Sequence, residues 1–176
     1  MRLLLVLFLT LLGIPSALAE SKECEEVRAA LDIGSDSTKL KIAKVNSCIQ
    51  KITEILYPKD ADLGQIKVRY KAAIDQTGRI NNETIIDGIA AIKTLLNEAT
   101  TRTGKPLTRI KGIATAAFRQ AANGNEVIDT LSAQTGVQII IVDQQLEAEL
   151  GFWGTIVHLA DSPEDVLVWD IGAGSM

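Results

Sequence analysis

Two short segments of the sequence combine an aspartate at the end of an apolar run with glycine and serine in a turn. They cover residues 32–37 (DIGSDS) and 170–175 (DIGAGS). Glycine lets the backbone approach a ligand closely, successive amides form an anion-binding nest, and an aspartate can hold hydrated Mg²⁺. The repetition suggests duplicated halves whose turns face each other. Together they predict a site for a metal-bound phosphate. Each turn taken alone could equally be a strand end capped by a carboxylate.

Other common sites do not fit the sequence. It has no G-x-S-x-G element of a serine hydrolase, and Lys105 is followed by Pro106 where a phosphate-binding P-loop needs serine or threonine. A dinucleotide fingerprint cannot be completed between Gly172 and the last residue. Two isolated cysteines and the single histidine, His158, cannot supply the four ligands of a structural zinc site.

The composition points to a folded, acidic domain. Of 176 residues, 47% are hydrophobic, and 18 Lys and Arg face 22 Asp and Glu, for a net charge of −4. This excludes a disordered tail and argues against nucleic acid as a partner, because the overall field repels polyanions. A phosphate ligand must therefore be held by local groups.

The N-terminus has the three parts of a secretory signal peptide. Arg2 precedes an apolar run over residues 3–12, and Ala17-Leu18-Ala19 forms a cleavage site. The run is too short to span a bilayer, which needs about 20 apolar residues. We therefore expect residues 1–19 to be removed and the protein to be exported, periplasmic or secreted, with no stable membrane anchor. A membrane anchor and a buried helix are the alternatives.

Export makes a disulfide between Cys24 and Cys48 the preferred interpretation, with two free thiols as the alternative. The expected first hairpin supports it. If residues 27–33 and 39–45 pair so that Ile33 lies opposite Lys39, the two cysteines lie opposite each other at the open end.

The periodicity of apolar residues changes along the chain from strand-like to helix-like. After three strands, residues 60–78 are hard to assign, and alternation at Val68, Tyr70 and Ala72 suggests a short hairpin. A long helix begins at Asn82, its expected cap, and ends near Gly104. The order is β-β-β-α-β-α-β-α-β, an α/β pattern. The remaining expected elements are strands at 49–56, 109–114, 137–142 and 166–170, and helices at 116–135, interrupted near 123–124, and 145–159.

Four segments, in order, resemble the exopolyphosphatase and guanosine pentaphosphate phosphohydrolase (Ppx/GppA) family. Residues 30–40 (ALDIGSDSTKL) are similar to its opening phosphate hairpin, and 112–123 (GIATAAFRQAAN) to its A-T-x-A-x-R-x-A-x-N stretch. Residues 143–150 (DQQLEAEL) resemble its S-G-x-E-E-A-x-L element, and 170–175 its second loop, D-I-G-G-G-S.

The resemblance implies a duplicated, actin-like ATPase (ribonuclease H-like) α/β fold with the active site between two lobes. We expect the first lobe over residues 20–160 and the start of a truncated second lobe over 161–176, so that this chain is an incomplete portion. The family removes terminal phosphates with Mg²⁺. Because guanosine pentaphosphate is a cytosolic nucleotide, inorganic polyphosphate is the expected substrate of an exported member. A homodimer of the full-length protein is left open.

The resemblance also assigns roles to single residues. Glu147 would be the general base that activates water, and Arg119 would bind a substrate phosphate. Asp32 and Asp170 would surround the metal, with Asp170 also counted as catalytic. The remaining substrate-binding positions are Gly34, Ser35, Asn123, Gly172, Gly174 and Ser175.

Departures from the family pattern keep two other functions open. Ala173 stands where the second loop usually has glycine, and Met176 where it usually has a hydroxyl residue. Ala173, together with the expected absence of the second lobe from this chain, favours a non-catalytic protein that binds phosphate or polyphosphate. An actin-like ATPase or sugar kinase that shares only the fold is the other alternative.

Overall fold

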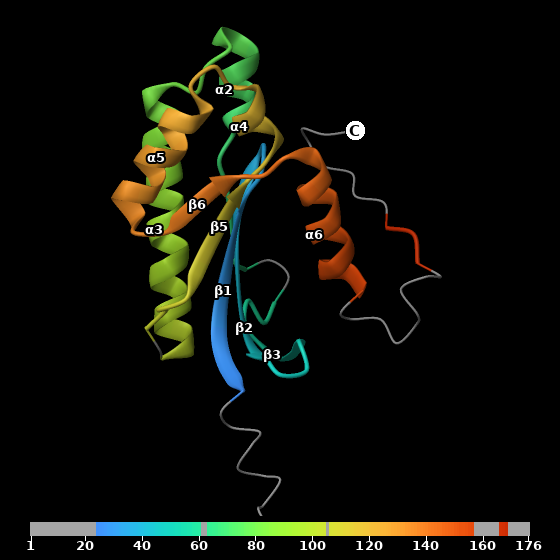
Figure 1. Cartoon of the computed structure of the whole chain (residues 1–176). Helices are drawn as coiled ribbons and strands as arrows, with labels where there is room; N and C mark the ends of the chain where they lie inside the picture. The colour runs from blue at the N-terminus through green and yellow to red at the C-terminus, as the bar shows by residue number, and fades with distance from the viewer. Residues whose placement is uncertain (1–23, 61–62, 105, 157–165, 169–176) are drawn as a thin grey trace, which may run out of the picture.

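The computed structural model describes residues 24–60, 63–104, 106–156 and 166–168, which form an α/β structure with one mixed sheet (Figure 1). The sheet order is β3-β2-β1-β5-β6, and β4 pairs with β2. Strands β5 and β6 run parallel to β1, whereas β2 runs antiparallel to β1, β3 and β4. The predicted signal peptide, residues 1–19, lies outside the described residues. The strands are β1 (Glu25–Ile33), β2 (Ser37–Asn46), β3 (Lys51–Tyr57), β4 (Gln65–Lys67), β5 (Ile110–Ala114) and β6 (Gln138–Ile141).

The predicted register of the first hairpin is wrong by one residue. Ile33 pairs with Thr38, and Asp32 pairs with Lys39. The reason is burial: Ile33 and Thr38 are both fully buried, and the predicted pairing would have placed buried Ile33 on the same face as exposed Lys39. The expected alternation of β2 is confirmed, with Leu40 buried and Lys39 exposed.

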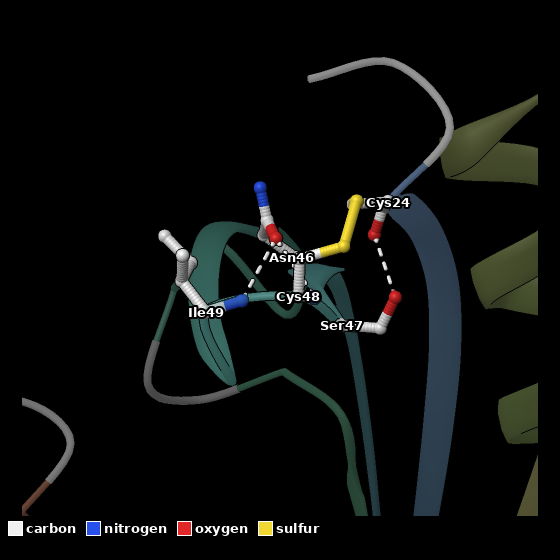
Figure 2. Close-up of a disulfide and its surroundings, with 5 residues drawn as sticks. All are labelled: Cys24, Asn46, Ser47, Cys48 and Ile49. Carbon is white, nitrogen blue, oxygen red and sulfur yellow. Dashed lines mark hydrogen bonds between the residues drawn. A yellow bond between two sulfur atoms is a disulfide. The ribbon is translucent and has the colours of Figure 1, made fainter. Parts of the chain in front are cut away.

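The structure joins Cys24 and Cys48 in a disulfide at the open end of this hairpin, with 5.6 Å between their Cα atoms (Figure 2). Because of the shifted register, Ser47 rather than Cys48 lies opposite Cys24, and the Ser47 N–H donates to the Cys24 carbonyl at 2.9 Å. The side chain of Asn46 then accepts the N–H groups of Cys48 and Ile49, which turns the chain back toward Cys24. The disulfide therefore closes through this turn.

The segment between β3 and the long helix differs from the predicted hairpin. It contains the short strand β4 and then a helix, α2 (Tyr70–Thr77). The buried residues of α2 are Tyr70, Ala73 and Ile74, which is helical spacing, whereas Ala72 is exposed. The predicted hairpin at Val68, Tyr70 and Ala72 is therefore wrong, because the apparent alternation comes from the start of a helix.

Two layers of helices lie on opposite sides of the sheet (Figure 1). The helices α3 (Asn82–Thr103) and α5 (Gly124–Thr135) cover one side, and α6 (Gln144–Ile156) lies on the other. The cap of α3 is Asn81, whose side chain accepts the N–H of Thr84 at 2.9 Å, and not Asn82 as predicted. The predicted interruption near residues 123–124 is confirmed, because α4 (Ala116–Gln120) ends before α5 begins.

The core lies between the sheet and the layer of α3 and α5. Leu31 and Ile33 of β1 point into it, together with Leu95 of α3 and Leu131 of α5. Other residues alternate toward the opposite face, which is more exposed.

The expected strand over residues 166–170 is not observed in its described part. Residues 166–168 carry no regular secondary structure, and the rest lies outside the described residues. A strand needs a neighbour for its backbone hydrogen bonds, and no strand of the described residues pairs with this segment. Within the described part of the chain, no helix has both the length and the apolar character needed to cross a bilayer.

Candidate active site

The carboxyl ends of β1, β5 and β6 are tied together by backbone hydrogen bonds beyond the strands. The Thr115 N–H donates to the carbonyl of Ile33 at 3.2 Å, and the Val142 N–H donates to that of Ala114 at 3.0 Å. Loops that follow neighbouring parallel strands meet at one edge of a sheet, where ligands of α/β proteins usually bind. The three family-like segments of the described chain therefore converge at this edge.

The turn after β1 is braced from behind by α2. The Gly34 N–H closes the turn on the Ser37 carbonyl at 2.9 Å. The Lys71 N–H donates to the carbonyl of Ser35 at 3.0 Å, and the N–H of Val68 donates to that of Asp36 at 3.1 Å. Ser35 is only 7% exposed. The Ser35 carbonyl is thus held by α2 and the Asp36 carbonyl by Val68, just before that helix, and these bonds brace the turn at the sheet edge.

Arg119 and Glu147 form an ion pair across the ends of β5 and β6. One guanidinium nitrogen of Arg119, Nη1, lies 2.7 Å from Glu147 Oε2 and also donates to the carbonyl of Val142 at 2.7 Å. Both side chains are partly buried, with 24% and 22% of their surfaces exposed. The structure therefore brings the predicted phosphate-binding residue and the predicted base into direct contact. Glu149 instead accepts a hydrogen bond from Gln145 on the exposed side of α6.

Asp143 determines where α6 begins. Its carboxylate accepts the N–H of Leu146 at 2.7 Å, and its carbonyl accepts the N–H of Glu147 at 3.0 Å. This is N-cap geometry, and it places Glu147 in the first turn of α6. Asp143 is not among the predicted site residues, although an aspartate between a β-branched strand and a helical pattern is a capping signal.

Asn123 is buried and its amide is already bonded. The amide oxygen accepts the N–H of Ile80 at 2.9 Å, and the amide nitrogen donates to the carbonyl of Ile80 at 2.8 Å. The predicted contact with substrate is therefore limited to the one N–H and the one lone pair that remain. Asn123 and Arg119 both line a hollow of about 370 Å³ between α4 and the start of α5.

Part of the predicted site lies outside the described residues. This applies to Asp170, Gly172, Gly174 and Ser175, whose positions relative to Glu147 stay predictions. Asp32 lies half-buried at the end of β1 and supplies a carboxylate oxygen, the donor type that Mg²⁺ prefers. Within the described ranges, no group of three or more His, Cys, Asp or Glu side chains could hold a metal ion. Asp32 suits a magnesium site by its chemistry and would supply one ligand of it.

The sequence pattern of the Ppx/GppA phosphatase family matches residues 59–176. Among solved structures, the Ppx/GppA family member from Aquifex aeolicus is similar, with 20% identity and a TM-score of 0.61. An exopolyphosphatase from Cytophaga hutchinsonii has 17% identity and a TM-score of 0.58, and an exopolyphosphatase-like protein has 24% and 0.59.

The chain spans well under half the length of these relatives. It aligns over 78% of its own length with 41% of the Aquifex aeolicus protein. The corresponding shares are 73% and 38% for the Cytophaga hutchinsonii protein, and 73% and 36% for the exopolyphosphatase-like protein. Ppx/GppA proteins have the actin-like ATPase fold, so the predicted fold class is confirmed for the part that the chain covers.

Proposed function

The chain belongs to the Ppx/GppA phosphatase family, and from this we propose that the complete protein hydrolyses terminal phosphoanhydride bonds of inorganic polyphosphate. The observation that carries the proposal is the ion pair between Arg119 and Glu147 at 2.7 Å. By the resemblance of their segments, these two residues correspond to the family's phosphate-binding arginine and general base. They meet at the edge that also holds the Gly34-Ser35 turn.

The ion pair explains how the two residues would act in turn. Without substrate, Arg119 donates to Glu147 and to the Val142 carbonyl. A terminal phosphate is a competing acceptor for the guanidinium, and Arg suits it because the planar group can donate two bonds. When Arg119 turns to phosphate, the Glu147 carboxylate is free to orient a water and accept its proton. The cap at Asp143 holds Glu147 in place during this exchange.

Asp32, with Asp170, would hold Mg²⁺, which when bound would neutralise phosphate charge. The chain itself supplies the backbone amides of the turn after β1. Because the Gly34 N–H already closes the turn on the Ser37 carbonyl, the amides that follow it, beginning with that of Ser35, would donate to phosphate oxygens, and burial of Ser35 keeps them rigid.

The test compares Glu147→Gln with Glu149→Gln in the full-length protein. Phosphate release from polyphosphate with Mg²⁺ is expected to fall by about 10²–10⁴-fold for Glu147→Gln, the usual contribution of a general base. Glu149→Gln, on the exposed side of the same helix, is expected to keep the wild-type rate. Equal rates for the two variants would remove Glu147 from the mechanism.

Two other outcomes would replace the proposal. Saturable binding of polyphosphate by the wild-type protein without turnover would assign a binding function. Faster hydrolysis of ATP than of polyphosphate would assign an actin-like ATPase.

We also propose that the protein works outside the cytoplasm. The signal-like N-terminus and the disulfide between Cys24 and Cys48 support this, because disulfides persist in oxidising compartments. Fractionation of the native source and a thiol count on the native protein test it. Cytoplasmic protein with two free thiols would refute it.

A further inference from the structure

The side-chain amide of Asn123 holds the backbone of a residue that lies far away in the sequence. The amide oxygen accepts the N–H of Ile80 at 2.9 Å, and the amide nitrogen donates to the carbonyl of the same residue at 2.8 Å. Next to it, the Ala122 N–H donates to the carbonyl of Gly78 at 3.0 Å. The link between α4 and α5 is therefore joined to the segment between α2 and α3 by three hydrogen bonds, two of which are buried.

The opposite end of α2 holds the turn after β1. The Lys71 N–H, at the start of α2, donates to the carbonyl of Ser35 at 3.0 Å. Next to it, the ring of Tyr70 lies 4.7 Å from that of Phe118 in α4, and both side chains are fully buried. The helices α2 and α4 lie together at the end of the sheet where β1 and β5 end (Figure 1). Thus α2 connects the phosphate turn at one end to Asn123 at the other.

The same contacts determine where Arg119 lies. Arg119 follows Phe118 in α4 and forms the ion pair with Glu147 at 2.7 Å. A shift of α4 relative to α2 would therefore move Arg119 relative to the turn. An asparagine suits this position because its amide offers a donor and an acceptor side by side. Without them, the N–H and the carbonyl of buried Ile80 would both lose their partners.

We propose that Asn123 is a positioning residue, which fixes α2 against α4 and thereby sets the spacing between the phosphate turn and Arg119. This rests on the proposed function and gives Asn123 a role other than the substrate contact that the family resemblance implies. A direct substrate contact through the remaining amide N–H and a contribution to stability alone are the two other roles. Each of the three roles predicts different kinetics.

The first test measures kcat and KM for polyphosphate in the full-length protein with Mg²⁺. Asn123→Asp keeps an acceptor for the Ile80 N–H but sets a carboxylate oxygen against the Ile80 carbonyl. Misplacement by about 1 Å can cost about 10²-fold in rate, so kcat and kcat/KM should fall together by roughly that factor.

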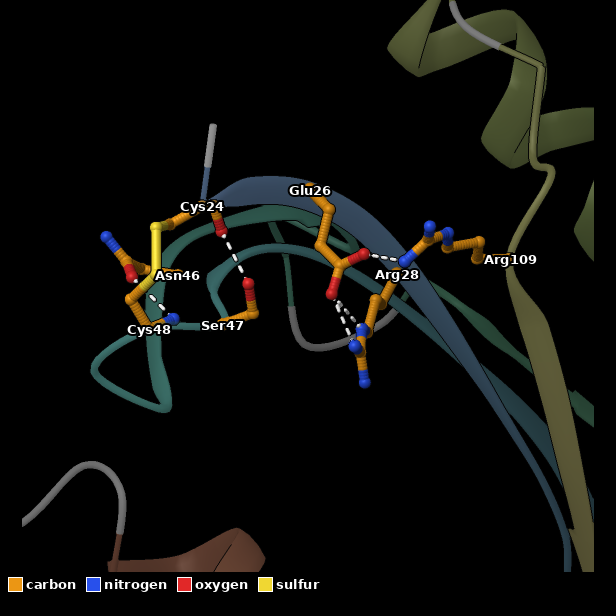
Figure 3. A network of polar contacts seen from close by, with 7 residues as sticks. All are labelled: Cys24, Glu26, Arg28, Asn46, Ser47, Cys48 and Arg109. Atoms are coloured by element: carbon orange, nitrogen blue, oxygen red, sulfur yellow. Dashed lines mark hydrogen bonds and ion pairs between the residues drawn. A yellow bond between two sulfur atoms is a disulfide. The ribbon is translucent and has the colours of Figure 1, made fainter. Parts of the chain in front are cut away.

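Two control variants accompany Asn123→Asp. Asn46 lies at the far end of the first hairpin, where its side-chain oxygen accepts two N–H groups (Figure 3). A carboxylate accepts them equally well, so Asn46→Asp should keep wild-type kinetics. Leu95→Ala truncates a fully buried side chain of α3 and controls for lost stability. It should keep the wild-type kcat at a temperature at which it is folded.

The kinetics separate the three roles of Asn123. A rise in KM with unchanged kcat in Asn123→Asp would overturn the proposal, because that result indicates a contact with substrate. Wild-type kinetics in Asn123→Asp, or an equal loss of kcat in Leu95→Ala, would overturn it as well. Asn123 would then contribute to stability alone.

The second test follows hydrogen exchange and does not depend on catalysis. At neutral pH the Lys71 amide, which donates to Ser35, should exchange about tenfold faster in Asn123→Asp than in the wild type, since its local opening becomes easier. The Leu146 amide, which Asp143 caps at the start of α6, should exchange at the wild-type rate.

Urea unfolding against pH tests the bonds to Ile80 themselves. A protonated carboxyl group can donate and accept as the amide does. Burial raises the pKa of the introduced carboxyl group above its usual value of about 4, so Asn123→Asp should match the wild type at low pH and lose stability as the pH rises. Arg119 and Glu126 line the same hollow, and Arg79 pairs with Glu126, so each variant is compared with the wild type at the same pH.

The outcomes separate this proposal from the proposed function. Unchanged exchange of the Lys71 amide in Asn123→Asp, with a wild type that hydrolyses polyphosphate, would refute the positioning role alone. A loss of stability in Asn123→Asp that persists at low pH would also refute it. A wild type that releases no phosphate would refute the proposed function, and exchange at Lys71 would then decide whether Asn123 holds the turn.

Discussion

Replacing Gly88 by alanine tests how closely α3 packs beneath the candidate site. A Cβ built on Gly88 would lie 2.2 Å from the hydroxyl oxygen of Tyr70 and 3.2 Å from its Cζ. Tyr70 is fully buried at the start of α2, the helix that braces the phosphate turn, and its ring lies 4.7 Å from that of Phe118. Since the ring is confined on both sides, the added methyl group must displace it or α3.

The magnitude follows from two opposing effects. Alanine is favoured over glycine inside a helix by about 1 kcal/mol, whereas overpacking a core costs about 1–3 kcal/mol. Gly88→Ala alone should therefore lower the free energy of unfolding by up to about 2 kcal/mol. In a Tyr70→Phe background the closest atom is gone, and the same substitution should be neutral or stabilise by up to about 1 kcal/mol. The expected coupling between the two sites is about 1–2 kcal/mol.

Tyr70→Phe is a suitable background because removal of the Tyr70 hydroxyl breaks no hydrogen bond to another described residue. Among the described residues neither this hydroxyl nor that of Thr38 has a hydrogen-bond partner, although the two groups lie near each other. Urea unfolding of the wild type, both single variants and the double variant gives the coupling directly. Free-energy changes that add to within about 0.5 kcal/mol would refute the close contact between Gly88 and Tyr70.

Three further predictions concern the stability of the protein and the helix cap at Asp143, which positions Glu147. Burial raises the pKa of Tyr70 to about 12, against about 10 in the unfolded chain, so the stability that the neutral phenol contributes should be complete below pH 10 and be lost between pH 10 and 12. Urea titrations against pH should show a larger loss in the wild type than in Tyr70→Phe, where Tyr57, whose pKa burial also raises, still contributes. Replacing Cys24 and Cys48 by serine should lower the free energy of unfolding by about 3 kcal/mol, because the disulfide closes a loop with a sequence separation of 24; a change below about 1 kcal/mol would contradict this. Asp143→Ala should cost about 1 kcal/mol of helix stability and speed hydrogen exchange in α6 several-fold, whereas Asp143→Asn keeps the acceptor for Leu146 and should restore protection; equal exchange in both variants would show that the cap does not hold α6.

The sequence by itself determined most of the order of elements and named the residues that the fold brings to one edge of the sheet. Continuous apolar runs and period-2 alternation predicted the strands, and three- and four-residue spacing predicted α3. Both signals are local and depend only on which face is buried. Arg119 and Glu147 were singled out by the resemblance of their segments to the Ppx/GppA family, and their roles stay predictions. The helix α2 was missed, since eight residues with three buried positions offer too short a pattern to separate helix from strand.

Only the tertiary structure decided how these pieces meet. The register of the first hairpin follows from the burial of Ile33 opposite Thr38. Both residues lie on the face of the sheet that α3 and α5 cover, and this packing fixes which residues pair. The direct contact between Arg119 and Glu147, and the cap that Asp143 provides, depend on where β5 and β6 end relative to each other. Such arrangements depend on contacts between residues far apart in the chain, which local periodicity does not encode.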